Sequence, residues 1–339
     1  QAASPSGGRI LTDTFYDAAG RVDHSYDTYY ATGTPGTDLV APADATTVPR
    51  QSRLVYDGVG RATANIFQPY GVERWRTSTA YGGDHTDVTP PSGGTPTSTY
   101  VDGRGRKTEL RQYRGSTPTG AYDATTYRYN NKNLLAQVSD PAGNTWTYGY
   151  DVQGRQTTLD DPDKGRTTST YDTAGRLSTV TDQRGVTLAY SYDNLHRRTG
   201  LYLNSTTGTR LAGWTYDSTP LPDGRPAKGQ ATSSTRYNGA DRYTITTTAY
   251  DDRYRPTGSS VSIPLSEGAI AGTYAFSTGY YADGSPASVT YPSVGDLGVE
   301  LVGINYTDLG LPLQLVNYYG SGTGSSYVSD TRYNALAEP

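Results

Sequence analysis

Residues that could carry chemistry are few and scattered in this sequence of 339 residues. The three histidines, His24, His85 and His196, lie far apart along the chain, and cysteine is absent. The absence of cysteine excludes disulfides, thiolate nucleophiles and thiolate metal sites. The sequence also contains no Gly-x-Ser-x-Gly elbow, no phosphate-binding Walker loop and no His-Glu-x-x-His zinc motif. We therefore expect a protein that is not an enzyme and has no catalytic residues.

Two further patterns are typical of ligand sites but are incomplete here. Asp160, Asp161 and Asp163 are clustered carboxylates of the kind that bind Ca²⁺, yet no bidentate Glu closes the site. Residues 320–324 form a glycine-rich string with no helix after it, which favours a loop over a phosphate cradle. We therefore expect neither a metal nor another cofactor.

Charge and hydropathy exclude two classes of partner. The net charge of -4 arises from 29 basic and 33 acidic residues that are interspersed, so the basic stripe required for nucleic-acid binding is missing. No apolar run approaches the ~18 residues of a membrane-spanning helix. We expect no nucleic acid and no membrane span.

The strongest signal is a repeat with a period of 21 residues. Tyrosines recur at this spacing, and each begins a near-copy of the phrase Tyr-Asp-x-x-Gly-Arg. The repeat positions are Tyr129, then Tyr150, Asp151, Gly154 and Arg155, then Tyr171, Asp172, Gly175 and Arg176, then Tyr192 and Asp193. A fixed period of this length indicates a repeat architecture in which each unit packs only against its neighbours.

Each period also contains a second corner, about half a period away from the first. Its residues are Asp140 and Gly143, then Asp161, then Asp182 and Gly185. Asp accepts hydrogen bonds from the backbone that follows it, and Gly tolerates positive φ, so both corners predict tight turns. We accordingly predict positive φ at Gly154 and Gly175.

The segments between corners are short and rich in Thr, Ser, Tyr, Val and Leu, which favours β-strands. The ninth residue after each leading tyrosine is apolar, which predicts an aliphatic row: Val138, Leu159, Val180 and Leu201. We also predict that Tyr150, Tyr171 and Tyr192 stack along one face of the sheet. With 32 Tyr, 3 Phe and 34% hydrophobic residues, a single-layer sheet fits better than a thick aliphatic core.

Looser copies of the phrase, such as those at Tyr16, Tyr56 and Tyr250, extend the pattern over nearly the whole chain. The pattern resembles the YD repeats of Rhs-type polymorphic toxins, of insecticidal toxin-complex shells and of teneurins. This resemblance implies an all-β fold, an antiparallel β-hairpin ribbon wound into a curved or spiral hollow shell or barrel. In bacterial members such a shell encloses a toxic C-terminal domain. The family's aspartate-dependent self-cleavage segment is not visible in this sequence.

We predict one YD-repeat array over residues 1–339, most regular at 129–215 and degenerate at 216–339. Insertions near 32–50 and 86–99 are expected to be surface loops. The apolar stretch 298–319 predicts either two well-packed strands at a seam or a surface for the remainder of a shell. Because the sequence has neither an initiator Met nor a signal segment, we expect a fragment of a longer precursor.

The resulting hypothesis is a non-catalytic shell segment of a secreted or cell-surface, bacterial-type protein that encapsulates or displays a C-terminal effector. Its partners would be the remainder of its own precursor, the enclosed domain and, through exposed strand edges, its own copies. An alternative is an extracellular adhesin or surface filament protein that binds glycans or its own copies. A third hypothesis is a carbohydrate-active enzyme, which would use paired carboxylates.

Overall fold

The computed structural model describes residues 2–3, 8–38, 40–318, 325–333 and 339. The chain divides into two compact units. Unit 1 comprises Gln1–Thr147, Tyr306–Leu313 and Asp330–Pro339, and unit 2 comprises Tyr148–Asn305 and Gln314–Ser329. Both units consist almost entirely of antiparallel β-strands, in agreement with the all-β fold expected from the sequence. That the units form one continuous array stays a prediction.

In unit 1 each strand pairs with the strand that follows it in the sequence, from β1 through to β12, and every pairing is antiparallel. Two short 3₁₀ helices, η1 (Ala45–Thr47) and η2 (Pro69–Gly71), lie in connections. The strands are β1 (Ala2–Ala3), β2 (Arg9–Tyr16), β3 (Val22–Ala31), β4 (Gln51–Tyr56), β5 (Ala62–Phe67), β6 (Trp75–Tyr81), β7 (His85–Thr89), β8 (Thr97–Val101), β9 (Lys107–Tyr113), β10 (Tyr122–Tyr129), β11 (Leu135–Ser139) and β12 (Thr145–Tyr150), the last of which crosses the boundary between the units.

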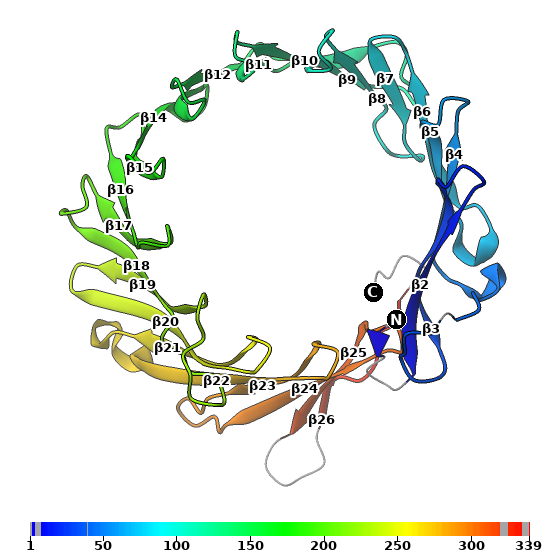
Figure 1. Cartoon of the computed structure of the whole chain (residues 1–339). Coiled ribbons are helices and arrows are strands. Elements are labelled where there is room, and N and C mark those ends of the chain that lie inside the picture. The colour runs from blue at the N-terminus through cyan, green and yellow to red at the C-terminus, as the bar shows by residue number, and fades with distance from the viewer. Residues whose placement is uncertain (1, 4–7, 39, 319–324, 334–338) are drawn as a thin grey trace. The chain divides into compact units, whose positions relative to one another are not determined.

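Unit 2 continues the same hairpin pattern, and Figure 1 shows its strands following one another in sequence order. One 3₁₀ helix, η3 (Leu265–Ile270), interrupts it. The strands are β13 (Gln156–Asp161), β14 (Gly165–Tyr171), β15 (Leu177–Thr181), β16 (Thr187–Tyr192), β17 (Arg198–Leu203), β18 (Arg210–Tyr216), β19 (Ala231–Asn238), β20 (Asp241–Tyr250), β21 (Pro256–Ile263), β22 (Gly272–Tyr280), β23 (Pro286–Tyr291), β24 (Glu300–Tyr306), β25 (Pro312–Tyr318) and β26 (Ser325–Val328).

The hairpins of the regular repeats share one register. In the β14–β15 hairpin, Ser169 lies opposite Val180, and the register shifts by one residue between Thr170 and Tyr171. The β16–β17 hairpin has the same shift between Ser191 and Tyr192. A one-residue shift next to a tight turn is a β-bulge, which adds local twist and ends the ladder at the leading tyrosine.

The aliphatic row predicted from the sequence lies on paired strands. Val180 is opposite Leu188, and Leu201 is opposite Tyr190 on one side and Ala212 on the other. Most strand residues are only partly buried, as expected for a sheet that is one layer thick. Small buried clusters occur where connections fold back: Leu11, Tyr26, Tyr29 and Val48 in unit 1, and Leu221, Ala227 and Tyr250 in unit 2.

The prediction of a loop at 86–99 is wrong for half of these residues. Thr86 and Val88 lie in β7, Thr97 and Thr99 lie in β8, and only residues 90–96 connect the two strands. β-branched residues at alternating positions favour strands, and this preference outweighs the overall richness in Thr and Pro. The expected loop at 32–50 contains only η1 among its described residues.

Part of the apolar stretch 298–319 forms β24 and the described strand β25, while Tyr319 lies outside the described residues. Val299, at the start of this stretch, is exposed rather than packed. Within the described residues, no helix combines the length and the apolar character that crossing a membrane requires.

Candidate functional site

The turn around Asp172 shows how one copy of the repeat phrase is built. The carboxylate Oδ1 of Asp172 accepts hydrogen bonds from the backbone N–H groups of Ala174 and Arg176, at 3.0 and 2.9 Å. Its Oδ2 accepts from Nε of Arg176 at 2.7 Å. The N–H of Gly175 donates to the carbonyl of Asp172 at 2.9 Å. A single aspartate therefore fixes the whole turn, and the motif's arginine closes it.

The same three carboxylate bonds recur in seven turns distributed over both units. In each turn the distance from the arginine Nε to the aspartate Oδ2 is between 2.6 and 2.8 Å. The aspartates are Asp17, Asp57, Asp102, Asp151, Asp172, Asp193 and Asp251, each followed four residues later by its arginine.

These bonds stabilise the charged form of the carboxylates. Hydrogen bonds from the Arg176 backbone and guanidinium lower the pKa of Asp172. In the matching turn of unit 1, the Arg106 guanidinium and backbone lower the pKa of Asp102 to about 2. A carboxylate held ionised in this way is poorly suited to act as a general acid near neutral pH.

The arginine of each motif also contacts the next repeat. The guanidinium carbon of Arg155 lies 4.5 Å from the ring centroid of Tyr171, and that of Arg176 lies 4.8 Å from the ring centroid of Tyr192. A guanidinium at this distance over a tyrosine face forms a cation–π contact. Arg176 additionally donates to the carbonyl of Asp193 at 3.3 Å.

That Tyr150, Tyr171 and Tyr192 stack along one face of the sheet stays a prediction. The structure places the guanidinium of the preceding repeat over the rings of Tyr171 and Tyr192. The same arrangement occurs elsewhere in both units: Arg21 over Tyr56, Arg61 over Tyr81, Arg106 over Tyr129, Arg197 over Tyr216 and Arg255 over Tyr280. The role of arginine was missed at the sequence level, although its fixed place in the motif was a usable signal.

The hydroxyl of each of these tyrosines donates a hydrogen bond to the preceding repeat. The acceptor is the backbone carbonyl of the residue directly after the motif arginine. Tyr192 donates to the carbonyl of Leu177, the residue that directly follows Arg176, at 2.8 Å. Tyr171 donates in the same way to Gln156, which follows Arg155, at 2.8 Å. Each of these tyrosines therefore connects its repeat to the preceding one twice, by the cation–π contact of its ring and by the hydrogen bond of its hydroxyl.

The predicted positive φ is confirmed at Gly154 (82°) and Gly175 (79°). Where the motif has drifted, a residue with a side chain adopts the same conformation: Asn133 (63°), His196 (63°) and Tyr254 (61°). The turn geometry is therefore kept at the cost of strain, which is greater for His and Tyr than for Asn.

The second corner of each period uses similar backbone bonds. Oδ1 of Asp140 accepts from the N–H of Asn144 at 2.8 Å, and Oδ1 of Asp182 accepts from the N–H of Val186 at 3.0 Å. Gly143 and Gly185 again have positive φ, 89° and 79°.

In the aspartate cluster considered for Ca²⁺, Asp161 stabilises a turn and Asp160 lies near an arginine. Oδ1 of Asp161 accepts from the backbone of Asp163 and Lys164, and Asp160 lies 3.7 Å from Arg166. Within the described residues no group of three or more His, Cys, Asp or Glu side chains could hold a metal ion.

The three histidines occupy separate settings. His24 stacks on Phe15 with ring centroids 4.2 Å apart, and His196 is an exposed turn residue. Nδ1 of His85 lies 2.8 Å from Asp84, and Nε2 lies 3.7 Å from Asp87.

Ser98 lies close to His85 but does not form a nucleophilic triad with it. Ser98 donates to Asp87 at 2.5 Å and is 1% exposed, so the carboxylate lies between the hydroxyl and the imidazole. A triad requires the imidazole to be in the middle, where it can accept the serine proton. The cluster is a partly buried polar network of unit 1.

Comparisons with known proteins agree with this geometry. The RHS Repeat family model matches residues 129–167 and 171–208, the most regular part of the chain. No curated protein sequence matches significantly.

Solved structures of toxin complexes match the fold. The TcdB2-TccC3 crystal structure matches with a TM-score of 0.68 and 16% identity over 97% of this chain. The Photorhabdus luminescens Tc holotoxin pore matches with a TM-score of 0.67 and 16% identity over 96% of this chain. In both cases the chain spans 17% of the length of the matched chain. The chain is thus similar to the RHS Repeat family over residues 129–167 and 171–208, and similar in fold to a part of these toxin-complex chains.

Proposed function

We propose that this chain forms part of the wall of an extracellular, bacterial toxin-complex-type shell that encloses or displays a C-terminal effector domain. One observation carries the proposal: each arginine of the motif both closes its own turn and covers the tyrosine of the next repeat, as Arg176 does for Asp172 and Tyr192. This arrangement connects hairpin to hairpin without a thick core, which is what a wall one sheet thick requires. The similarity to toxin-complex chains supports it.

The chemistry of the site favours a mechanical role over a catalytic one. The recurring carboxylates are paired with arginine, as in Asp151–Arg155 at 2.6 Å, and are therefore committed to the turns. The partners that fit this role are the remainder of the same shell, other components of a toxin complex and the enclosed domain.

The test is limited proteolysis of the full-length gene product. A wall that encloses the C-terminal region should protect this region at protease concentrations that digest it rapidly once it has been expressed alone. Arg176→Ala should shorten the protection time, because it removes the connection between two repeats. The control is Arg184→Ala, which removes an exposed arginine that pairs with Asp182 of its own turn only.

Equal digestion rates for the C-terminal region, alone and within the full-length product, would contradict enclosure. Self-association of the full-length product in light scattering, combined with such rapid digestion, would favour the alternative of a self-assembling surface protein.

A further inference from the structure

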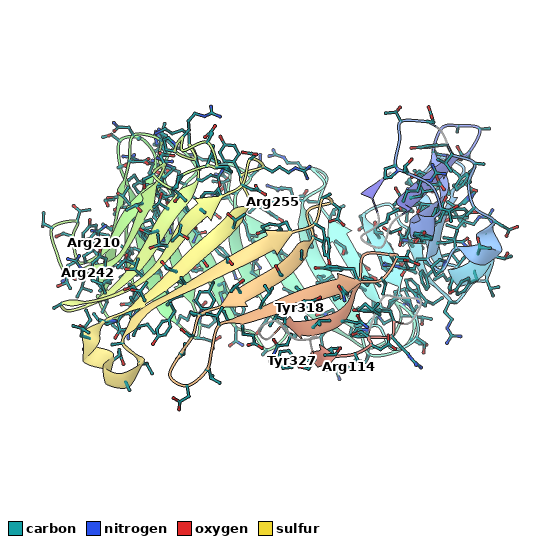
Figure 2. The ribbon with its side chains drawn as sticks, turned by 90° about the horizontal axis from the view of Figure 1, so that it is seen from below. Arg114, Arg210, Arg242, Arg255, Tyr318 and Tyr327 are labelled. Carbon is teal, nitrogen blue, oxygen red and sulfur yellow. The ribbon has the colours of Figure 1, made fainter. Side chains whose placement is uncertain are left out.

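An apolar groove with a volume of about 540 Å³ lies on unit 2, next to strands β22, β23, β24 and β26. Figure 2 labels Tyr327 on β26, at one side of this region. The groove is lined by aromatic rings, by the aliphatic residues Val294 and Leu297 of the 292–299 connection and by one carboxylate; the rings and the carboxylate are Tyr274, Phe276, Tyr291, Tyr327 and Glu300. Phe276 and Tyr291 pack edge to face, with ring centroids 6.0 Å apart.

These rings differ from the tyrosines that lie under a motif arginine. In those tyrosines a guanidinium lies over the ring, as the guanidinium carbon of Arg255 lies 4.4 Å from the ring centroid of Tyr280. Within the part of the chain that the structure describes, no Lys or Arg lies over Tyr274, Phe276 or Tyr291. The negative faces of these rings remain available to a cation from outside.

The charge of the groove also favours a cation. Glu300 forms no ion pair with any described residue, and no Lys or Arg lines the groove. The exposed Asp296 lies in the connection between Val294 and Leu297, whose backbones pair at 3.0 Å. The groove thus combines the carboxylate of Glu300 with aromatic walls and has no basic residue in its lining, while Asp296 lies in the adjoining connection.

The groove is held in place by a chain of hydrogen bonds. Asn317 is 5% exposed, and its Nδ2 donates to the hydroxyl oxygen of Tyr327 at 2.9 Å. The Tyr327 hydroxyl in turn donates to Glu300. These bonds fix the ring of Tyr327 and the carboxylate of Glu300 before any ligand arrives, which lowers the cost of binding.

The scarcity of acceptors indicates which cation fits. A guanidinium brings five N–H donors and a primary ammonium brings three, and each unpaired donor in an apolar groove costs free energy. The groove offers few acceptors, since Glu300 already accepts from Tyr327, and the Tyr274 hydroxyl donates to the carbonyl of Ile270 at 2.9 Å. A quaternary ammonium has no N–H donor and needs none of these acceptors.

We propose that this groove binds a quaternary ammonium group of the choline type. Its methyl groups contact the rings of Tyr274, Phe276 and Tyr291, and its charge is balanced by Glu300. The proposal goes beyond the function of the shell wall and does not depend on it, because the groove residues are not part of the turn motif.

Isothermal titration of the purified chain with choline chloride tests the proposal. The control ligand is 3,3-dimethyl-1-butanol, which has the shape of choline but no charge. We expect saturable binding of choline in the millimolar range and at least tenfold weaker binding of the neutral analogue. Equal binding of the two ligands, or no binding of choline, would overturn the proposal.

Two variants locate the site. Tyr291→Leu removes one ring and should weaken choline binding by about tenfold, because it removes one cation–π contact. Glu300→Gln keeps the shape of the side chain and should weaken binding while leaving the far-ultraviolet circular dichroism spectrum unchanged. The matched control is Tyr16→Leu, which changes an exposed tyrosine of unit 1 and should leave binding unchanged. Equal binding by all four proteins would place the ligand elsewhere and overturn the assignment.

Sedimentation with phosphatidylcholine vesicles distinguishes the two sources of the group. Binding of free choline without co-sedimentation would indicate a soluble ligand. Co-sedimentation that free choline competes away would indicate a lipid headgroup.

Discussion

The two corners of each period show what is needed to make a turn and what is needed to join turns. In unit 2 the turns at Asp172 and Asp182 have the same backbone bonds, since Gly175 and Gly185 donate to the aspartate carbonyls at 2.9 and 3.0 Å. Both aspartates accept a backbone N–H four residues later, at 2.9 and 3.0 Å. An aspartate and a glycine are therefore sufficient for the corner itself.

The corners differ in what their arginines contact. Arg184 is 79% exposed and pairs with Asp182 of its own turn. Arg176 is 28% exposed, pairs with Asp172 and also contacts Tyr192 and the Asp193 carbonyl of the next repeat. An arginine contacts the next repeat when it is the last residue of the Tyr-Asp-x-x-Gly-Arg motif, as Arg176 is. The arginine of the second corner, Arg184, pairs with its own turn.

The two ends of the strands in unit 2 show this difference in Figure 2. Arg255, which closes a motif turn and lies over Tyr280, is at one end of the strands. Arg210 and Arg242 are at the other end, where Arg210 lies 5.0 Å and Arg242 lies 5.8 Å from the ring centroid of Tyr237. Both ends use cation–π contacts, but only the motif end combines them with an aspartate-closed turn.

Acid should act on all motif turns together and produce the largest effect. Their aspartates have a lowered pKa when folded, which for Asp102 is about 2 and for Asp172 is a shift in the same direction. A carboxylate with a lowered folded pKa stabilises the fold above its unfolded pKa, near 3.8, and this contribution is lost as the pH falls towards the folded pKa. The urea midpoint should therefore be constant from pH 7 to pH 5 and decrease between about pH 4 and pH 2.

Replacing the aspartate of each corner by Asn shows how much the charge contributes to stability at the two kinds of corner. Asp172→Asn keeps a turn acceptor but removes the charge opposite Arg176, so it should reduce the stability at pH 7 more than Asp182→Asn does. A midpoint that does not change with pH, or equal effects of the two variants, would contradict the account.

Removal of a motif arginine that contacts the next repeat should have the second largest effect on the free energy of unfolding. Arg176→Ala removes a charge-assisted hydrogen bond and a cation–π contact, which together predict a loss of about 2 kcal/mol. Arg184→Ala should change stability by less than about 0.5 kcal/mol, as is usual for exposed pairs. Urea denaturation followed by circular dichroism provides both values, and similar losses would remove the distinction between the corners.

Substitution of the turn glycine tests the part that both corners share. Gly175→Val places a β-branched residue at φ 79° and should cost about 1–3 kcal/mol through backbone strain. The control is Gly58→Ala, because Gly58 does not have positive φ and an added Cβ there meets nothing within 4 Å. Thermal denaturation measures both, and an unchanged melting temperature for Gly175→Val would contradict the turn assignment.

The smallest expected effect is a gain in stability. His196 occupies the glycine position of a drifted motif at φ 63°, so His196→Gly should relieve strain and stabilise the chain by about 0.5–1 kcal/mol. Asn133→Gly should gain less, because Asn tolerates this conformation better than other side chains do. A loss of stability in His196→Gly would show that its ring contributes a contact.

Local features of this chain could be predicted from its sequence, whereas contacts between repeats could not. The turns at Asp151 and Asp172 were predictable because all the atoms that form them lie within five residues. The position of Arg155 over Tyr171 depends on how one hairpin pairs with the next, and spacing alone does not provide this register. The spacing predicts a row of tyrosines on one face of the sheet, but it does not indicate that an arginine of the preceding repeat lies over each ring.

The aromatic groove of unit 2 was beyond prediction for a different reason. Its members Phe276, Tyr291 and Tyr327 come from degenerate copies in which no period places them side by side. The stretch 298–319 was expected to form either well-packed strands at a seam or a surface for the remainder of a shell, and neither alternative indicates that its residues Gly298 and Glu300 line a groove together with Leu297 of the exposed connection.

The arginine of one repeat should be coupled energetically to the tyrosine of the next, as the contact of Arg176 with Tyr192 indicates. A double-mutant cycle with Arg176→Ala and Tyr192→Leu measures this coupling, with native-state amide exchange in β14 to β17 reporting the local free energy of opening. The account predicts a coupling of about 1 kcal/mol for this pair. It predicts a value near zero for Arg176→Ala with Tyr171→Leu, in which the tyrosine belongs to the arginine's own repeat. Equal coupling of Arg176 to both tyrosines, or none to Tyr192, would contradict it.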